Sequence, residues 1–457
     1  MNAVPILLEQ ETSATETYNR DSVTAAEFYK GKIRSVPKVP IKTLADFSIW
    51  YTPGIAEVSR RISKDTSLSF EMTGRWNSVA ILTDGTRVLG IGNVGPEAAM
   101  PVMEGKALLF NYLGGVNAVP IPIRVQDREA FFDVAKALEP SFGGFNLEDI
   151  ESPKCFFLLE KLQKELEIPV WHDDQLGTAS IILAGLYNAL KITGKQLKDV
   201  RLVLLGSGAA NVATAHLLKA AGFNMGNITL VDSKGILNPS REDMDSLMIN
   251  NPWKYDLAMM TNSDRLTGGP AEAIRGADVV VSASRSDPGF MKQDWIRSMQ
   301  DDPIIFALAN PFPEIWPSKA KEAGARIVAT GRGDFPNQIN NSLVFPAVFR
   351  GVLDARAKGV NFDVMVTASR EIAEFIKDPH EDRIVPNMGD WEMYPQVASA
   401  VAAKTSELGL SRVRGSRNQF LSTATEIIEE NRRFYQKSVE SGMVRELKEA
   451  GIIGKEY

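Results

Sequence analysis

Acidic residues follow two short apolar segments of this chain. The segment beginning at Ile168 runs into Asp173 and Asp174, and the segment around Phe145 runs into Glu148 and Asp149. Acidic residues at the carboxyl ends of strands lie where α/β proteins bind ligands. Because so many like charges cannot stay ionised side by side without a positive partner, the simplest partner is a divalent cation with oxygen ligands. The pattern therefore predicts a metal site between two strand ends.

A glycine-rich turn indicates a second site. It follows the apolar run 200–205 and opens a helical pattern, an order that favours a dinucleotide-binding βαβ unit. Gly206 permits the tight turn, and Gly208 lets backbone N–H groups approach a pyrophosphate at the helix N-terminus. Asn211 replaces the third glycine of the usual pattern, so a glycine turn in a purely structural βαβ unit is the alternative. The predicted cofactor-binding residues of the turn are Gly206, Ser207, Gly208, Ala209, Ala210 and Asn211.

Asp232 ends the next predicted strand, 24 residues beyond Gly208. A carboxylate there is expected to accept hydrogen bonds from both ribose hydroxyls of NAD. It would repel the 2′-phosphate of NADP, although the neighbouring Lys234 could relieve that repulsion. The sequence therefore favours NAD and leaves NADP possible.

Strands and helices alternate along most of the chain, which predicts an α/β fold with mostly parallel sheets. We expect an N-terminal α/β catalytic domain over residues 1–178. A Rossmann-type dinucleotide-binding domain with C-terminal helices is expected over residues 179–457. The expected strands are 78–83, 118–123, 144–148, 170–174, 200–205, 228–231, 279–282, 304–308 and 327–329.

Local signals add detail. Residues 1 to about 20 are polar and expected to be mobile, and a short helix is expected over 25–32. Asp84-Gly85 between two apolar runs predicts a hairpin of 78–83 with 88–92. Beyond Pro346 the chain is expected to be helical, apart from a loop over 379–395.

The bulk composition excludes several classes of protein. The 457 residues carry a net charge of −6, and no basic run has interleaved aromatic residues, so we expect no nucleic-acid partner. The single cysteine, Cys155, excludes an intrachain disulfide and is expected to be a buried thiol. We find no targeting segment, and the longest uncharged apolar stretch, 176–190, is shorter than the roughly 18 residues of a membrane span. A cytoplasmic protein without a membrane partner is the expectation.

Several segments, in order, resemble the malic enzymes. The resemblance covers roughly residues 35–400 and is closest to the short prokaryotic-type forms. The segments are Tyr51-Thr-Pro-Gly-Ile-Ala-Glu57, Thr83-Asp-Gly85, Leu89-Gly-Ile-Gly92, Pro101-Val-Met-Glu-Gly-Lys-Ala107, His172-Asp-Asp-Gln-Leu-Gly-Thr178, Ala309-Asn-Pro311 and Asn340-Asn-Ser-Leu-Val-Phe-Pro346.

This resemblance implies oxidative decarboxylation of L-malate to pyruvate and CO₂ with NAD or NADP and Mg²⁺ or Mn²⁺. It also implies a homo-oligomer, a dimer or higher. The implied catalytic residues are Tyr51, Lys106 and Asp173; the metal ligands are Glu148, Asp149 and Asp174; the substrate-binding residues are Arg87, Asn310 and Asn341, and Asn310 is also expected to bind the cofactor.

The chemistry explains these residue types. Loss of a hydride from C2 requires a base for the C2 hydroxyl, and Lys106 can serve if a nearby cation and desolvation lower its pKa. Decarboxylation leaves an enolate that a metal ion stabilises as a Lewis acid. Tyr51 is suited to return a proton to C3. Asp173 and Asp174, being adjacent, are expected to divide their work, with Asp173 holding Lys106 and Asp174 on the metal.

Each residue also has a plainer interpretation. Lys106 could be a solvated helix lysine, Tyr51 an interface aromatic, and Glu148 with Asp149 a charge pair before a helix. Asn310 and Asn341 could simply start turns. Two further functions stay open: an enzyme for another 2-hydroxy or 2-keto dicarboxylic acid, and an inactive nucleotide-sensing protein on the same scaffold.

Overall fold

Two parallel sheets form the centre of the molecule. The computed structural model describes residues 3–88 and 90–452, with only the backbone described for residues 3–15. The first sheet has the order β2-β1-β3-β4, and the second has the order β10-β9-β8-β5-β6-β7, in which only β7 is antiparallel. The strands are β1 Ser78–Thr83, β2 Asn117–Pro122, β3 Gly144–Leu147, β4 Val170–His172, β5 Leu202–Leu205, β6 Ile228–Asp232, β7 Gly235–Ile236, β8 Val279–Ser282, β9 Ile304–Ala307 and β10 Ile327–Thr330.

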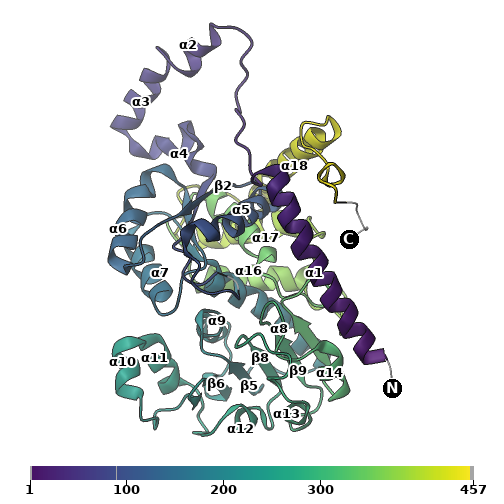
Figure 1. Cartoon of the computed structure of the whole chain (residues 1–457). Helices are drawn as coiled ribbons and strands as arrows, with labels where there is room; N and C mark the ends of the chain where they lie inside the picture. The colour runs from purple at the N-terminus through teal and green to yellow at the C-terminus, as the bar shows by residue number, and fades with distance from the viewer. Residues whose placement is uncertain (1–2, 89, 453–457) are drawn as a thin grey trace.

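Helices cover these sheets (Figure 1). They are α1 Ala3–Tyr29, α2 Asp46–Trp50, α3 Ile55–Lys64, α4 Ser69–Met72, α5 Gly95–Gly114, α6 Arg128–Leu138, α7 Lys154–Glu165, α8 Thr178–Thr193, α9 Ala209–Ala220, α10 Met244–Asn250, α11 Pro252–Met260, α12 Pro270–Ile274, α13 Gln293–Arg297, α14 Pro317–Glu322, α15 Phe345–Asp354, α16 Phe362–Phe375, α17 Met393–Glu407 and α18 Arg417–Glu440. The predicted α/β fold is confirmed. Short apolar runs became strands because parallel strands are buried on both faces.

The helix α8 runs through the core between the two sheets. It and the turn before it form one stretch, Asp173–Thr193, that is long and apolar enough to cross a membrane by length and composition. However, 72% of its most apolar window is buried inside the protein. Its apolar surface is therefore covered by its own neighbouring helices, chiefly α16 and α9. Cys155 is buried as predicted.

The predicted hairpin of 78–83 with 88–92 is wrong. β1 pairs in parallel with β2 and β3, and Val88 and Gly92 form only an isolated bridge. Leu89 lies outside the described residues. Burial on both faces makes β1 a central strand, and the turn at Gly85 leads the chain towards Gly95, where α5 begins. A Cβ atom on Gly85 would lie 2.2 Å from the Gly95 carbonyl oxygen, so this close approach requires glycine.

The N-terminal region also differs from the prediction. The backbone from Ala3 to Tyr29 forms α1, so the expected short helix at 25–32 is the end of a long one. The mobility expected for residues 1 to about 20 stays a prediction. The Tyr29 hydroxyl donates a hydrogen bond to the Arg445 carbonyl oxygen (2.8 Å), and the Arg445 guanidinium lies over the Phe28 ring. These contacts join the end of α1 to the C-terminal segment.

The C-terminal helices pack on one another and on α5, which lies beside the first sheet. α15, α17 and α18 all contact α5, and α16 packs on α8. Beyond Pro346 the described chain is mainly helical, as predicted, and the expected loop over 379–395 corresponds to residues 376–392. Shorter non-helical segments, which were not predicted, separate α15 from α16 and α17 from α18. The division of the chain at residue 178 stays a prediction.

Candidate active site and nucleotide site

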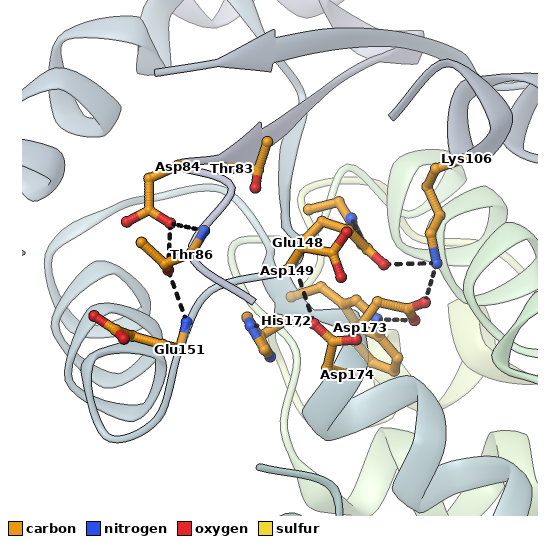
Figure 2. A network of polar contacts seen from close by, with 12 residues as sticks. Thr83, Asp84, Thr86, Lys106, Glu148, Asp149, Glu151, His172, Asp173 and Asp174 are labelled. Atoms are coloured by element: carbon orange, nitrogen blue, oxygen red, sulfur yellow. Dashed lines mark hydrogen bonds and ion pairs between the residues drawn. The ribbon is translucent and has the colours of Figure 1, made fainter. Parts of the chain in front are cut away.

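Three predicted metal ligands lie together. Glu148 and Asp149 follow β3, Asp174 follows β4, and one carboxylate oxygen of each lies within 4.8 Å of the others. Because β3 and β4 are adjacent parallel strands, their carboxyl ends meet at one edge of the sheet. The Asp149 backbone N–H donates to Asp174 Oδ2 at 3.0 Å, which fixes the two segments against each other (Figure 2). Oxygen donors from three carboxylates, two of them buried and that of Asp174 partly exposed, suit a hard divalent cation.

Lys106 reaches this cluster from α5. Its side chain is only 8% exposed, and its Nζ lies 2.5 Å from Asp173 Oδ2 and 3.0 Å from Glu148 Oε1 (Figure 2). Burial lowers the pKa of Lys106, but the carboxylates of Asp173 and Glu148 outweigh it and raise that pKa. The lowered pKa that the sequence analysis expected requires a cation beside Lys106 and stays a prediction. Burial raises the pKa of Glu148 well above its usual range despite the neighbouring Lys106.

Asp173 is fixed from two sides. The Trp171 indole N–H donates to its Oδ1 at 2.9 Å, while Lys106 contacts its Oδ2. From the sequence, Asp173 and Asp174 are expected at the end of a strand. They instead open a π-helical turn, Asp173–Gly177, that continues into α8. Such turns are frequent at functional sites because they redirect side chains. Here the turn points Asp173 to Lys106 and Asp174 to Asp149.

Gly177 closes this turn beside Asn341. A Cβ atom at Gly177 would lie 2.0 Å from Asp173 Oδ1 and 3.1 Å from the Cβ atom of Asn341. Only glycine therefore fits between these two predicted site residues. The structure thus places Asn341, which opens a 3₁₀ turn before α15, next to Asp173.

A second polar network supports the metal-ligand loop. The buried Asp84 accepts a hydrogen bond from the Thr86 hydroxyl (2.6 Å) and pairs with Lys154 Nζ on α7 (2.5 Å). Thr86 Oγ1 in turn accepts from the Glu151 backbone N–H (3.0 Å; Figure 2). The loop after β1 is thereby tied to the loop after β3, which carries the acidic cluster.

Arg87 follows this network directly. Its backbone N–H donates to the Asp149 carbonyl oxygen at 2.9 Å, and its side chain is exposed. Asp149 has a left-handed backbone (φ 53°), a conformation that costs energy in a residue other than glycine and recurs at functional sites. The arrangement leaves the Arg87 guanidinium free to turn towards a ligand beside Asp149.

The glycine-rich turn lies where the sequence predicted it, between β5 and α9. Gly206 has φ +88°, and a Cβ atom there would lie 2.5 Å from the Ala283 carbonyl oxygen. A Cβ atom at Gly208 would meet open space, so the backbone of this residue faces an accessible region before α9. The Asn211 amide donates to the Leu205 and Gly206 carbonyl oxygens, both at 2.9 Å. Asn211 therefore fastens the turn rather than loosening it. Ser207 is buried, and Ala209 and Ala210 form the first turn of α9.

Asp232 ends β6 beside two cations that the sequence analysis did not single out. Its Oδ1 accepts a hydrogen bond from Arg241 Nη1 (2.9 Å), and its Oδ2 lies 3.5 Å from Lys254 Nζ. The Lys234 backbone N–H also donates to Oδ1 (2.8 Å). Arg241 lies nine residues and Lys254 twenty-two residues beyond Asp232, and no spacing rule would have selected them. The negative charge of Asp232 is largely balanced.

Asn310 lies in the loop after β9, where the two halves of the chain meet. A Cβ atom on Gly90 would lie 2.8 Å from the Asn310 carbonyl oxygen, so the loop after β1 comes close to this residue. The buried Glu314 fastens the same region: Oε1 accepts from Ser282 Oγ (2.7 Å) and from the Ser284 N–H (2.8 Å). Sequence reasoning missed Glu314, because a glutamate in a loop carries no signal of burial.

Tyr51 stands apart from this assembly. It follows α2, and its side chain is 71% exposed. Figure 1 shows α2 and α3 projecting from the body, away from α5, which carries Lys106. Among the residues that the structure describes, neither helix buries a single side chain. Within one chain, the described residues do not bring Tyr51 to the carboxylates.

Comparisons with known proteins bear on the whole assembly. The family model "Malic enzyme, N-terminal domain" matches residues 30–133, and "Malic enzyme, NAD binding domain" matches residues 176–406. The bifunctional malic/malolactic enzyme of Bacillus subtilis is 44% identical over 386 residues, covering 84% of this chain and 92% of that protein. The NAD-dependent malic enzyme of Geobacillus stearothermophilus is also 44% identical, covering 84% of this chain and 78% of that protein. This chain belongs to the malic enzyme family.

Solved structures agree with the assignment to the malic enzymes. That of the Entamoeba histolytica malic enzyme superposes with a TM-score of 0.93 at 39% identity, covering 97% of this chain and 94% of the other. That of the malic enzyme from Pyrococcus horikoshii gives a TM-score of 0.86 at 43% identity, covering 92% and 95%. The family resemblance seen in the sequence is therefore confirmed. The roles of individual site residues stay predictions.

Proposed function

We propose that this member of the malic enzyme family oxidises L-malate and releases CO₂ to form pyruvate, with a nicotinamide dinucleotide as the hydride acceptor. The observation that carries the proposal is the juxtaposition of Lys106 and Asp173 with the cluster Glu148, Asp149 and Asp174. A general base, its partner and an oxygen-donor metal site are the groups that this reaction requires. A cytoplasmic location fits such a reaction and is part of the proposal.

The carboxylates of Glu148, Asp149 and Asp174 would hold Mg²⁺ or Mn²⁺, because three carboxylates this close together, two of them buried, are unfavourable as bare anions. The bound ion would supply positive charge that stabilises an enolate and disfavours the protonated form of Lys106. Glu148 contacts Lys106, and a cation bound to the same carboxylate would weaken its attraction for the ammonium group.

The chain's own residues would then divide the proton transfers. Lys106 Nζ, in its neutral form, takes the proton of the substrate C2 hydroxyl, and Asp173 orients the amine. Arg87 and Asn341 bind substrate polar groups at the edge of the cluster. Asn310, in the loop that meets Gly90, lies between substrate and nicotinamide. The hydroxyl of Tyr51 returns a proton to C3.

A second copy of the chain would explain the position of Tyr51. The segment that contains α2 and the start of α3 leaves several large apolar side chains between 40% and 86% exposed: Leu44, Phe47, Ile49, Trp50, Tyr51 and Ile55. The body exposes apolar side chains in return, Met100 and Leu108 on α5 and Val119 on the edge strand β2. Apolar surface of this extent marks an interaction site. We infer a dimer or higher oligomer in which the projecting helices of one copy cover α5 of another and bring Tyr51 towards its Lys106.

The cofactor is proposed to be NAD, with NADP as a weaker alternative. Asp232 can accept both ribose hydroxyls, which supports NAD. Arg241 and Lys254 offset its charge, which explains how a 2′-phosphate could be tolerated. Relatives named for either cofactor have similar sequence identity to this chain. The NAD-dependent malic enzyme of Geobacillus stearothermophilus is 44% identical, and the NADP-dependent malic enzyme of Halomonas elongata is 40% identical.

The deciding experiment is an assay with purified protein, L-malate, Mn²⁺ and NAD or NADP. The expected result is nucleotide reduction that EDTA abolishes and excess Mn²⁺ restores, with pyruvate as the product. Reduction with a different 2-hydroxy acid only would favour another dicarboxylate substrate. Nucleotide binding without turnover of any tested acid would favour a sensor. Detecting lactate instead of pyruvate would contradict the proposed reaction.

A further inference from the structure

A pocket separate from the carboxylate cluster is lined mainly by residues of α7, α9, α11 and α16. Its volume is about 430 Å³, enough for a small organic molecule. Phe156 and Trp253 form one aromatic wall, with ring centroids 5.0 Å apart. His216 and Phe362 form a second wall, stacked with centroids 6.4 Å apart. Flat apolar surfaces on two sides favour a planar ring as the occupant.

Two residues that line the pocket carry buried polar atoms without partners in the described part of the chain. The Gln175 side chain is 3% exposed, and its Nε2 amide makes no hydrogen bond with any residue in the described part of the chain. The buried Nε2 atom of His216 also has no hydrogen-bond partner among residues 3–88 and 90–452. Burial lowers the pKa of His216, so the imidazole is neutral and its Nε2 can serve as acceptor or donor. Buried polar atoms without partners are uncommon and point to a missing ligand or water.

The charge at the mouth has one sign. Glu160 and Asp256 line the pocket, and no lysine or arginine is among its lining residues. Glu160 also accepts a hydrogen bond from the Trp253 indole. Phosphates and carboxylates are therefore disfavoured, whereas an ammonium group gains from the carboxylates and from the aromatic faces.

The pocket touches both segments that carry the proposed chemistry. Gln175 belongs to the π-helical turn that begins with Asp173 and Asp174. His216 lies on α9, whose first turn follows the glycine-rich loop. These two segments also pack on each other. A ligand held between them would favour one relative placement and so alter affinity at the nucleotide site.

We propose that this pocket binds a small aromatic amine with a polar ring substituent, and that its occupation changes the affinity of the protein for NAD. The ring lies between the two aromatic walls, the ammonium group faces Glu160 and Asp256, and the ring substituent accepts from Gln175. The coupling to NAD rests on the proposed function, whereas amine binding itself does not.

The test uses tyramine as the probe and 4-hydroxyphenylacetate, which carries a carboxylate in place of the amine, as its matched anion. Isothermal titration calorimetry on the full chain should show tyramine binding and no binding of the anion. The double variant Glu160→Gln/Asp256→Asn should weaken tyramine binding about fivefold or more. The control Asp294→Asn removes an exposed carboxylate on α13 and should leave binding unchanged.

Further titrations of NAD with and without saturating tyramine test the coupling. The apparent Kd for NAD should change by about fivefold or more in one direction, and NAD should change the tyramine Kd by the same factor. No tyramine binding up to about 10 mM, equal binding of the anion, or no loss in the double variant would overturn the site. An unchanged NAD affinity would overturn the coupling. Loss of malate turnover in the assay above, with tyramine binding intact, would remove only the proposed reaction.

Discussion

The environment of Lys106 sets the chemistry at the scale of single residues. A buried ammonium group between Asp173 and Glu148 is strongly held in its charged form, which is the opposite of what a base needs. The same contacts, however, place the amine at a fixed point beside the predicted metal ligands. The structure thus positions the Lys106 amine for catalysis. Whether that amine is protonated depends on the net charge of the carboxylate cluster and any cation bound to it.

Replacing Lys106 by alanine should lower kcat about 10²- to 10⁴-fold and change the KM for malate little. The reason is that the amine acts on the hydroxyl proton in the transition state and contributes less to substrate binding. Steady-state kinetics with saturating Mn²⁺ would measure both constants. The matched control is Lys136→Ala, which removes an exposed lysine paired with Glu165. A kcat within twofold of the parent would exclude Lys106 as the base.

Asp232→Ala should raise the KM for NAD and shift the preference towards NADP by about tenfold. Removing the carboxylate takes away an acceptor for the ribose hydroxyls and frees Arg241 and Lys254 for a 2′-phosphate. Comparing kcat/KM for both nucleotides would measure the shift. Asp264→Ala, which breaks an exposed pair with Arg201, serves as the control. An unaltered cofactor ratio would refute the ribose contact.

At the scale of elements, the loops after β1 and β3 act as a unit. Lys154 on α7 pairs with the buried Asp84, and Thr86 accepts from the Glu151 backbone. None of these residues is a predicted metal ligand, but together they hold the backbone from which Glu148 and Asp149 project. Partners of this kind commonly tune metal affinity by fixing the ligands.

Lys154→Met should therefore weaken Mn²⁺ binding about tenfold while the protein stays folded. The methionine keeps the length and apolar stem of lysine and removes the charge that Asp84 needs. Electron paramagnetic resonance of free Mn²⁺ would give the affinity, and circular dichroism would verify folding. Lys136→Met is the control for loss of a surface lysine. Equal Mn²⁺ affinity in both variants would show that the Asp84 pair does not support the ligand loop.

Comparing these elements with the sequence shows what can be predicted. Every strand except β7 could be located because each is a short apolar run, and the strand ends then place Glu148, Asp149 and Asp174 together. The hairpin at Asp84 was wrong because a local turn signal cannot reveal that β1 is buried on both faces.

Contacts between distant residues were beyond reach for another reason. Lys154 and Asp84 are seventy positions apart, and Glu314 meets Ser282 across two loops. Nothing in composition or spacing links such pairs, because only the packed fold brings them together. The Gly-rich turn was predictable, but the way Asn211 stabilises it was not.

At the scale of the whole molecule, the arm formed by α2 and α3 is the least explained by a single chain. Helices of this length gain most of their stability from packing, yet these two bury none of their side chains. A second copy would explain both the exposed arm and the distance of Tyr51 from the carboxylates. It would cover the apolar side chains of the arm and place Tyr51 near its own Lys106. The site would then consist of Lys106 from one chain and Tyr51 from another.

This arrangement predicts complementation between two inactive variants. Lys106→Ala and Tyr51→Phe chains, each nearly inactive alone, should recover activity when co-expressed. In a mixed dimer one site receives an intact Tyr51 from the first chain and an intact Lys106 from the second, so a purified mixed dimer should show about half of the parent activity. Random assortment should give about a quarter, because about half of the dimers are mixed. Two different affinity tags isolate the mixed dimer, and size-exclusion chromatography verifies that both variants still associate. If Tyr51 instead acts within its own chain, every site in the mixed dimer carries one defect, and the isolated mixed dimer stays as inactive as its parents.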